Sequence, residues 1–395
     1  MNFPSPSAAR PAIGSFHATT PRRTTASARL SAGLAACAAV LALVVAGCAE
    51  IKPQASSERD LGPLVYPAPP DQPRFYFERT IMSSADVIAD NEDDAWRRAL
   101  TGESRAGFFM SKPYGIAVNR GRLFVTDTAE RQVKVFDIPE GRYFTIGEED
   151  PGQLAKPIGI DTDEAGNVYV ADASTRTIQI YDRDGNHLRA IKGDDMFDRL
   201  ASVTVSADGS LLYVVDIGGV SSQNHRVRVF DSMTGELRQD IGKRGNGPGE
   251  FNLPRDLAIG KDGKLYVVDG GNFRVQIFDN GGQFIDSFGA AGRQLGNFSR
   301  PKEVAVDPDG NVYVVDTAFG NFQIFNPEGE LLMFIGQRSD SPGPGRYMLP
   351  SGIAIDLDGR VYFVDQWFRK IDVFRPAALK EGEGYTDAPL DTAAK

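Results

Sequence analysis

The chain has 395 residues, an apolar fraction of 41%, 42 glycines, 24 prolines and a formal net charge of −10. The apolar content can form a core, which excludes a wholly disordered chain, and the many turn-forming residues favour a β protein. The acidic balance argues against nucleic acid or an anionic lipid surface as the main partner. Both cysteines lie within the first 48 residues, so the rest of the chain has no thiol chemistry.

The first 47 residues have the pattern of an export signal. Residues 1–29 carry basic side chains and no acid, and an uncharged apolar run extends from Leu30 to Gly47. The run ends at Val45-Ala-Gly-Cys48, which resembles the lipobox of bacterial lipoproteins. The resemblance implies cleavage before Cys48 and attachment of lipid to its thiol. Because Ala49 follows rather than Asp, it also implies sorting to the outer membrane. A plain membrane-spanning helix is the alternative.

A proline-rich segment follows the cysteine. Residues 48–73 contain six prolines and no periodic apolar pattern, which predicts an irregular tether. The folded part would then face the periplasm or the cell surface, in contact with the membrane only through its lipid anchor.

Six internal repeats occupy most of the chain. An aromatic residue followed three positions later by Asp recurs at intervals of 44 to 53 residues. The six pairs are Phe124/Asp127, Tyr169/Asp172, Tyr213/Asp216, Tyr266/Asp269, Tyr313/Asp316 and Tyr362/Asp365. Each repeat contains short strand-like segments separated by turns, and the third has a five-residue insertion around residues 218–223. This arithmetic predicts an all-β, six-bladed β-propeller over residues 74–376.

Fragments within the repeats resemble the NHL repeat. The resemblance is carried by Asn224-His-Arg-Val-Arg-Val-Phe230, Asn272-Phe-Arg-Val-Gln-Ile-Phe278 and the openings Pro113-Tyr-Gly-Ile-Ala-Val118 and Pro350-Ser-Gly-Ile-Ala-Ile355. It covers residues 113–375 and implies an NHL/TolB-like propeller. Propellers of this type serve many roles, so the resemblance implies much less about activity.

The two ends of the repeat array predict how the ring closes. The sixth repeat has only three strands, and the strand-like segment 74–81 lies outside every repeat. We expect residues 74–81 to complete the sixth blade and remove its open edge. We also expect a short helix over residues 91–100 that covers this strand, and a disordered tail over residues 377–395.

The six recurrent Asp residues are expected to be structural. Each should cap the turn between the second and third strands or pair with a nearby arginine such as Arg131, Arg176 or Arg369. Asp256 and Glu303 are different because they open the innermost strands of neighbouring repeats, near one mouth of the channel. They could hold Ca²⁺ or Mg²⁺, or act as an acid and base pair, but the sequence favours a structural or solvated role for both.

Catalytic candidates are few. Six-bladed relatives include metal-dependent lactonases and lyases, which keep a fuller set of ligands around the channel. Here His187 and His225 lie on different repeats, and we expect both at the surface. No serine stands in a strand-to-helix elbow. The sequence therefore favours a protein that is not an enzyme and has no cofactor.

The connections between repeats are long and carry basic residues on one face of the predicted ring. They include Arg244, Arg293, Arg300, Lys302, Arg338 and Arg346. Long loops on a rigid scaffold are where binding sites usually lie. We therefore expect a lipid-anchored binding or scaffold module whose partner is an envelope protein or an extracellular polymer. The alternative is a metal-dependent hydrolase or lyase that uses Asp256 and Glu303.

Overall fold

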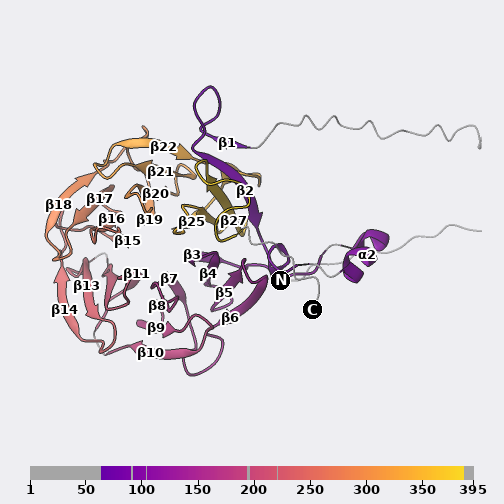
Figure 1. The fold of residues 1–395 in the computed structure, drawn as a ribbon. Coiled ribbons are helices and arrows are strands. Elements are labelled where there is room, and N and C mark those ends of the chain that lie inside the picture. The colour runs from indigo at the N-terminus through magenta and orange to yellow at the C-terminus, as the bar shows by residue number, and fades with distance from the viewer. Residues whose placement is uncertain (1–63, 90–91, 104, 194–195, 220, 387–395) are drawn as a thin grey trace, which may run out of the picture. The chain divides into compact units, whose positions relative to one another are not determined.

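The computed structural model describes residues 64–89, 92–103, 105–193, 196–219 and 221–386. Over these ranges the chain forms six antiparallel sheets arranged as a ring (Figure 1). The prediction of an all-β, six-bladed propeller is confirmed. The expected signal peptide, Cys48 and tether residues 48–63 lie outside the described residues. Within them, no helix has the length and apolar character needed to cross a membrane.

Each blade has four main strands in up-and-down order. Blade 1 consists of β3 (Pro113–Asn119), β4 (Arg122–Asp127), β5 (Gln132–Asp137) and β6 (Arg142–Ile146), and blade 2 of β7 (Pro157–Thr162), β8 (Val168–Asp172), β9 (Thr177–Tyr181) and β10 (His187–Ile191). Blade 3 consists of β11 (Leu200–Val205), β12 (Leu211–Asp216), β13 (Arg226–Asp231) and β14 (Leu237–Ile241), and blade 4 of β15 (Pro254–Ile259), β16 (Leu265–Asp269), β17 (Arg274–Phe278) and β18 (Phe284–Phe288). Blade 5 consists of β19 (Pro301–Val306), β20 (Val312–Asp316), β21 (Asn321–Phe325) and β22 (Leu331–Ile335), and blade 6 of β25 (Pro350–Ile355), β26 (Val361–Asp365), β27 (Lys370–Pro376) and β2 (Phe75–Ile81).

Short elements complete the fold. They are β1 (Val65–Tyr66), the 3₁₀ helix η1 (Ser84–Asp86), the helix α2 (Glu92–Thr101), β23 (Gln337–Arg338) and β24 (Arg346–Tyr347). The predicted helix is present, but its Trp96 and Leu100 side chains are 69% and 67% exposed. These side chains therefore do not cover the closing strand as expected.

The core lies between the blades. Six clusters of buried apolar side chains each join two neighbouring blades, as where Phe136 of blade 1 packs in one cluster with Val364 of blade 6. The middle strands supply most of these residues because both of their faces meet another blade. β16, for example, is buried along its whole length.

Strands from both ends of the chain form blade 6. β2 pairs antiparallel with β27, from Phe75 opposite Pro376 to Ile81 opposite Ile371, and lies beside it in Figure 1. This pairing covers the open edge of β27, as predicted for residues 74–81. The fully buried guanidinium of Arg360 fastens the junction by an ion pair of 2.8 Å to Glu78 of β2.

Two predicted boundaries need correction. Residues 64–73 are not entirely tether, because β1 adds to the outer edge of β2 and the Tyr66 ring packs edge-on against Phe374. The tail is not disordered over residues 377–386. There the Tyr385 N–H donates to Asp358 Oδ2 at 3.1 Å, and the Glu383 carbonyl accepts from Arg360 at 3.0 Å. Residues 387–395 lie outside the described residues.

Candidate functional site: the central cavity and the long-loop face

The six recurrent Asp residues are fully buried and act as structural caps. Asp172 illustrates the pattern, because its carboxylate accepts hydrogen bonds from the N–H groups of Lys156, before the inner strand, and of Ser174, in the turn after its own strand. The capping role is therefore confirmed. The expected arginine partners are wrong, since the ion pairs form instead between Arg226 and Asp216 and between Arg274 and Asp269.

These caps define one face of the ring. Each cap joins the end of a second strand to the start of an inner strand, so both lie on the same side, together with the connections between blades. We call this side the long-loop face. It comprises the starts of the inner strands, the turns between second and third strands, and the inter-blade connections 147–156, 192–199, 242–253, 289–300 and 336–349. The remaining turns form the opposite face.

The last three connections have one repeated, rigid structure. Gly242, Gly289 and Gly336 begin them with φ of 76°, 87° and 100°, a region that favours glycine. A Cβ on any of the three would overlap an aromatic ring, namely that of Phe251, Phe298 or Tyr347. Side chains of third strands hold two of the loops from below, because Gln276 and Gln323 accept from the N–H groups of Gly249 and Gly296 at 2.9 and 2.7 Å. The loops are therefore fixed by the scaffold.

The predicted basic residues lie on this face. Arg293, Arg300, Arg338 and Arg346 are exposed, whereas Arg244 and Lys302 are half-buried. Among the described residues, none of the six has a carboxylate within ion-pair distance. Cations elsewhere are commonly paired, as in the contact of 2.6 Å between Arg122 and Asp137. The structure thus leaves the charge of these six residues uncompensated by close contacts.

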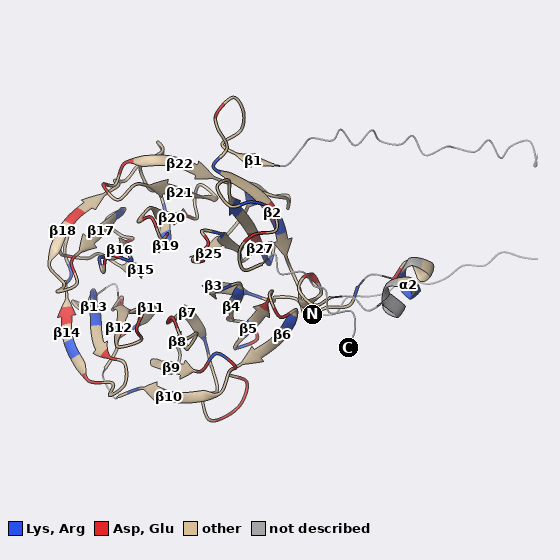
Figure 2. Ribbon diagram, viewed as in Figure 1, with Lys and Arg blue, Asp and Glu red and all other residues tan. Residues whose placement is uncertain are grey.

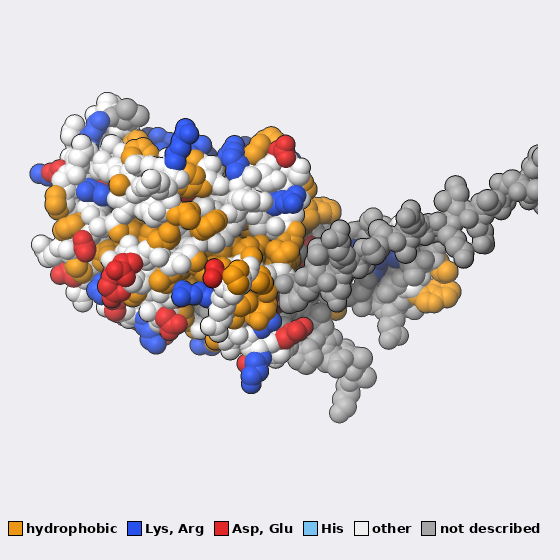
Figure 3. Space-filling view, turned by 90° about the horizontal axis from the view of Figure 1, so that it is seen from above, with side chains coloured by type: hydrophobic (Ala, Val, Ile, Leu, Met, Phe, Trp, Pro, Cys, Tyr) orange, Lys and Arg blue, Asp and Glu red, His pale blue; other side chains and the backbone are white. Residues whose placement is uncertain are grey.

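Charge differs between the two faces of the ring. Charged residues occur around all six blades (Figure 2), and Figure 3 shows Lys and Arg along both edges of the ring, with most Asp and Glu toward the lower edge. On the long-loop face, leaving aside the segment 82–111, the exposed cations are Lys112, Arg131, Lys156, Arg176, Lys192, Arg199, Lys243, Arg255, Arg293, Arg300, Arg338, Arg346 and Arg369, against Glu130, Glu148, Glu149, Asp150, Asp198 and Asp340. On the opposite face, apart from the segments before β2 and after β27, the exposed acids are Glu140, Glu164, Asp184, Asp208, Glu236, Asp262, Asp309, Glu328 and Glu330, against Arg120, Arg183 and Lys261.

Lys302 lies at the channel mouth on the long-loop face. Its ammonium group sits 3.8 Å from the centre of the Tyr114 ring, which comes from blade 1. Burial lowers the pKa of Lys302 to about 8, and the Glu303 and Asp256 carboxylates oppose this shift. Burial, together with the Glu303 carboxylate, raises the pKa of Tyr114 to about 12. This contact joins blades 1 and 5 at the channel mouth, and sequence reasoning missed Tyr114.

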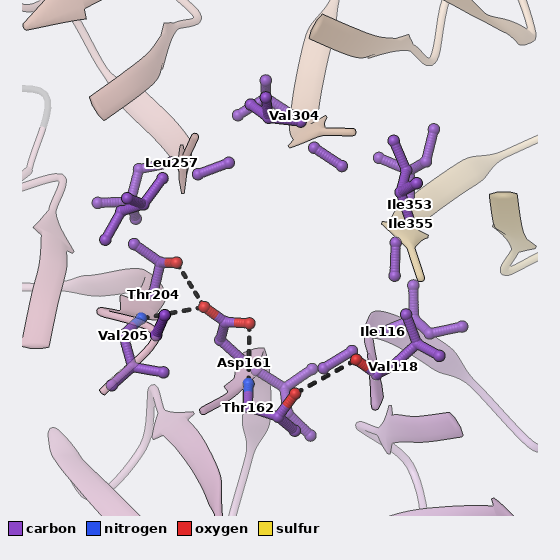
Figure 4. A pocket seen from close by; sticks show the side chains of 18 of the residues that line it. Ile116, Val118, Asp161, Thr162, Thr204, Val205, Leu257, Val304, Ile353 and Ile355 are labelled. Atoms are coloured by element: carbon purple, nitrogen blue, oxygen red, sulfur yellow. Dashed lines mark hydrogen bonds between the residues drawn. The ribbon is translucent and has the colours of Figure 1, made fainter. Parts of the chain in front are cut away.

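Inside the ring, a central cavity of about 740 Å³ is lined by the inner strands. The residues labelled in Figure 4 are mostly apolar, with Ile116, Leu257, Val304 and Ile353 among them. Asp161 points into the cavity. The predicted pair, Asp256 and Glu303, also lines this cavity. The structure therefore brings both predicted carboxylates to one site and adds a third.

The carboxylates link neighbouring blades. Asp256 Oδ2 accepts from the Val304 N–H at 2.8 Å, and Glu303 Oε2 accepts from the Ile353 N–H at 3.2 Å. Burial raises the pKa of Asp256 to about 6. Burial and the nearby charge of Asp256 raise the pKa of Glu303 well above its usual value. Because one oxygen of each carboxylate accepts from a backbone amide and burial disfavours the charged forms, they fit a divalent cation poorly. Within the described residues, no cluster of three or more His, Cys, Asp or Glu is arranged as a metal site.

Asp161 is the carboxylate that the sequence reasoning missed. It accepts from the Val205 N–H at 3.0 Å and from the Thr204 hydroxyl (Figure 4). A repeat alignment could have found it. Four of the other inner strands have Ala at the equivalent position, and the remaining one has Thr204 itself.

The histidine prediction is wrong for His225, which is fully buried. Its Nδ1 accepts from the Leu253 N–H at 3.1 Å, while Nε2 lies 3.2 Å from the Gly219 carbonyl. His225 therefore links the blade 3 insertion to the next connection. His187 is partly buried and contacts the side chain of Gln179 at 3.0 Å.

Comparison with known proteins agrees with this architecture. Residues 251–278 match the family model of the NHL repeat. The chain is a six-bladed β-propeller with one segment that matches the NHL repeat. It is similar to NHL repeat-containing protein 3 of Mus musculus, with 26% identity over 207 residues (48% of this chain and 58% of that protein). The Homo sapiens protein of the same name is 30% identical over 196 residues (44% and 53%). The matches span little more than half the length of these relatives.

Solved structures resemble this propeller in fold alone. A streptogramin B lyase is 15% identical with a TM-score of 0.51, covering 68% of this chain and 94% of its own. A gluconolactonase from Xanthomonas campestris is 16% identical with a TM-score of 0.52, covering 76% and 98%. A protein of unknown function from Bacteroides thetaiotaomicron is 17% identical with a TM-score of 0.55, covering 78% and 84%. At such identities the neighbours' activities do not transfer to this chain.

Proposed function

We propose that the protein is a lipid-anchored binding module of the bacterial cell envelope. Its long-loop face would meet an anionic partner, either an envelope protein or an extracellular polymer. Cys48 would carry the lipid, and Ala49 after it implies attachment to the outer membrane. This proposal includes no enzymatic activity and no nucleic acid partner.

The observation that carries the proposal is the uncompensated positive charge on rigid loops. Arg293 and Arg300 lie on the connection 289–300 and Arg338 lies on the connection 336–349, and each is exposed with no carboxylate within ion-pair distance among the described residues. The protein as a whole is acidic, so a basic face requires local segregation of charge. Such a face steers an anionic partner toward one orientation and rejects cationic ones.

The test is binding of the purified protein to envelope material from cells that produce it. The triple variant Arg293→Glu, Arg300→Glu and Arg338→Glu should bind at least tenfold more weakly, and wild-type binding should weaken as salt rises. The matched control is Arg120→Glu, Arg183→Glu and Lys261→Glu, which makes the same charge change on the opposite face. Equal loss in both triple variants, or no loss in the first, would contradict the proposal.

The alternative of a metal-dependent hydrolase or lyase predicts a different measurement. Because the Asp256 and Glu303 carboxylates accept backbone N–H groups, we expect no stoichiometric divalent ion in the purified protein. Elemental analysis, with melting curves before and after chelation, would measure this. One ion per chain, with a chelator-sensitive melt that Asp256→Ala abolishes, would support the enzyme instead.

A further inference from the structure

A second, smaller cavity lies on the long-loop face between blades 3 and 4. Its volume is about 400 Å³, and its lining residues are Gln223, Arg244, Gly245, Asn246 and Asn252. Gln223 belongs to the insertion that distinguishes blade 3, and the other four belong to the connection 242–253. We call this cavity the amide notch. Apart from the glycine, every lining side chain is a carboxamide or a guanidinium.

The amide notch presents unused hydrogen-bonding groups. Within the described part of the chain, the carboxamides of Gln223, Asn246 and Asn252 have no hydrogen-bond partner. Arg244 donates from Nη1 to the Ser222 carbonyl at 3.0 Å, which holds its guanidinium against the insertion. No described carboxylate lies within ion-pair distance of Arg244. The cavity therefore offers several donors and acceptors together with one positive charge.

The walls of the notch are held in place by the scaffold. The Gly245 N–H donates to the Phe251 carbonyl at 2.9 Å, and the Gly245 carbonyl accepts from the Asn272 amide at 3.0 Å. His225 joins the two walls, as described above. A site whose backbone is already ordered loses little entropy when a ligand binds.

The fold does not require this set of side chains. The next connection has the same local structure, because Arg244 bridges to Phe251 as Ala291 bridges to Phe298. By this alignment, the counterparts of Asn246 and Asn252 are Arg293 and Ser299, and the adjacent turn has no insertion. The amide-rich set thus belongs to one junction, as a specific site would.

We propose that the amide notch binds one carboxylate-bearing sugar residue, so that the partner is an acidic polysaccharide. This inference rests on the proposed function of the long-loop face and narrows its partner. Carboxamides both donate and accept, which matches sugar hydroxyls, and a guanidinium matches a carboxylate. The volume is within the range of small-ligand pockets. An acidic peptide fits less well because the notch has no apolar side chain to receive its hydrocarbon parts.

The test is calorimetric titration of the full-length protein with glucuronate and galacturonate, alone and as short oligomers. Saturable binding is expected, tighter for oligomers than for monomers. Glucose tests the contribution of the carboxylate, acetate tests the contribution of the sugar hydroxyls, and a short poly-glutamate peptide tests the competing partner. Glucose and acetate should each bind at least tenfold more weakly than the uronates.

Variants locate the site. Gln223→Ala and Asn246→Ala should each weaken uronate binding severalfold, and Arg244→Gln should reduce it to the level of glucose. Gln294→Ala, an exposed amide on the neighbouring connection, is the matched control and should change nothing. Melting temperatures should stay unchanged, because Gln223 and Asn246 are exposed.

Several results would overturn this inference. They are the absence of saturable uronate binding, uronate binding that is insensitive to the notch variants, acetate binding as tightly as uronate, and poly-glutamate binding in place of uronate. The envelope assay with the triple variants is scored separately. Charge-dependent envelope binding without uronate binding would refute the notch while leaving the proposed function in place.

Discussion

Asp256 shows at the residue scale how a buried carboxylate can join two blades. It is the third residue of β15, and its Oδ2 accepts from the Val304 N–H of the next blade at 2.8 Å. The side chain is only 8% exposed, and burial raises its pKa to about 6. A hydrogen bond to a bulged strand accounts for an acid at this position without any ligand.

This geometry predicts how stability depends on pH. The pKa of Asp256 is about 6 in the folded protein and near the ordinary 3.8 in the unfolded chain, so deprotonation favours unfolding. The stabilisation that Asp256 contributes is therefore fully present below about pH 4 and is lost as the pH rises through 6. The shift corresponds to about 3 kcal/mol. The free energy of unfolding, measured with urea, should fall between pH 4 and pH 7 by about 3 kcal/mol less in Asp256→Asn than in the wild type. Identical losses in both proteins would argue against the assignment.

The residues that sequence reasoning missed share a physical cause. Asp161, Tyr114 and His225 act across a junction between blades or between an insertion and a connection. One repeat read alone contains no sign of its neighbour. Asp161 had a signal in the repeat alignment, whereas the Tyr114 contact with Lys302 spans blades 1 and 5 and had none.

At the scale of elements, the blades could be predicted because their sequence pattern recurs along the chain. Elements outside the repeats could not, because they have no recurring pattern. Six aromatic and Asp pairs gave the number of blades, and the missing fourth strand of the last repeat gave the role of β2. β1 has two residues and therefore no periodicity, and residues 377–386 are held by contacts to side chains elsewhere. Such elements are ordered by tertiary contacts rather than by local pattern.

The closure of the ring can be tested through Arg360. Its guanidinium is fully buried between Glu78 of β2 and Asp358 of the turn before β26. Arg360→Met would leave Asp358 without its cation and Glu78 with only the partly exposed Arg79, at 3.3 Å, and should cost about 3–5 kcal/mol of unfolding free energy. A double-mutant cycle with Glu78→Gln, measured by urea unfolding, should give a coupling energy well above error. Arg238→Met removes an exposed pair with Asp231 and should have little effect. Additive effects of the Glu78 and Arg360 changes would show that this pair does not fasten the blade.

At the scale of the whole molecule, the two faces of the ring differ in charge and in construction. The long-loop face carries most of the exposed Lys and Arg on loops fixed by glycines, buried aromatic rings and glutamine side chains. The opposite face carries short turns rich in Asp and Glu, several of which satisfy their own backbone, as where Asp208 accepts from Ser210. This asymmetry is the physical basis for assigning the partner to one face.

Site-specific photo-cross-linking in intact envelopes tests this assignment most directly. A photoreactive residue would replace Arg338 on the long-loop face in one variant and Arg183 on the opposite face in another. Cross-linked protein or polymer should form from position 338 and not from position 183. Cross-links from position 183 alone, or equally from both, would contradict binding through the long-loop face.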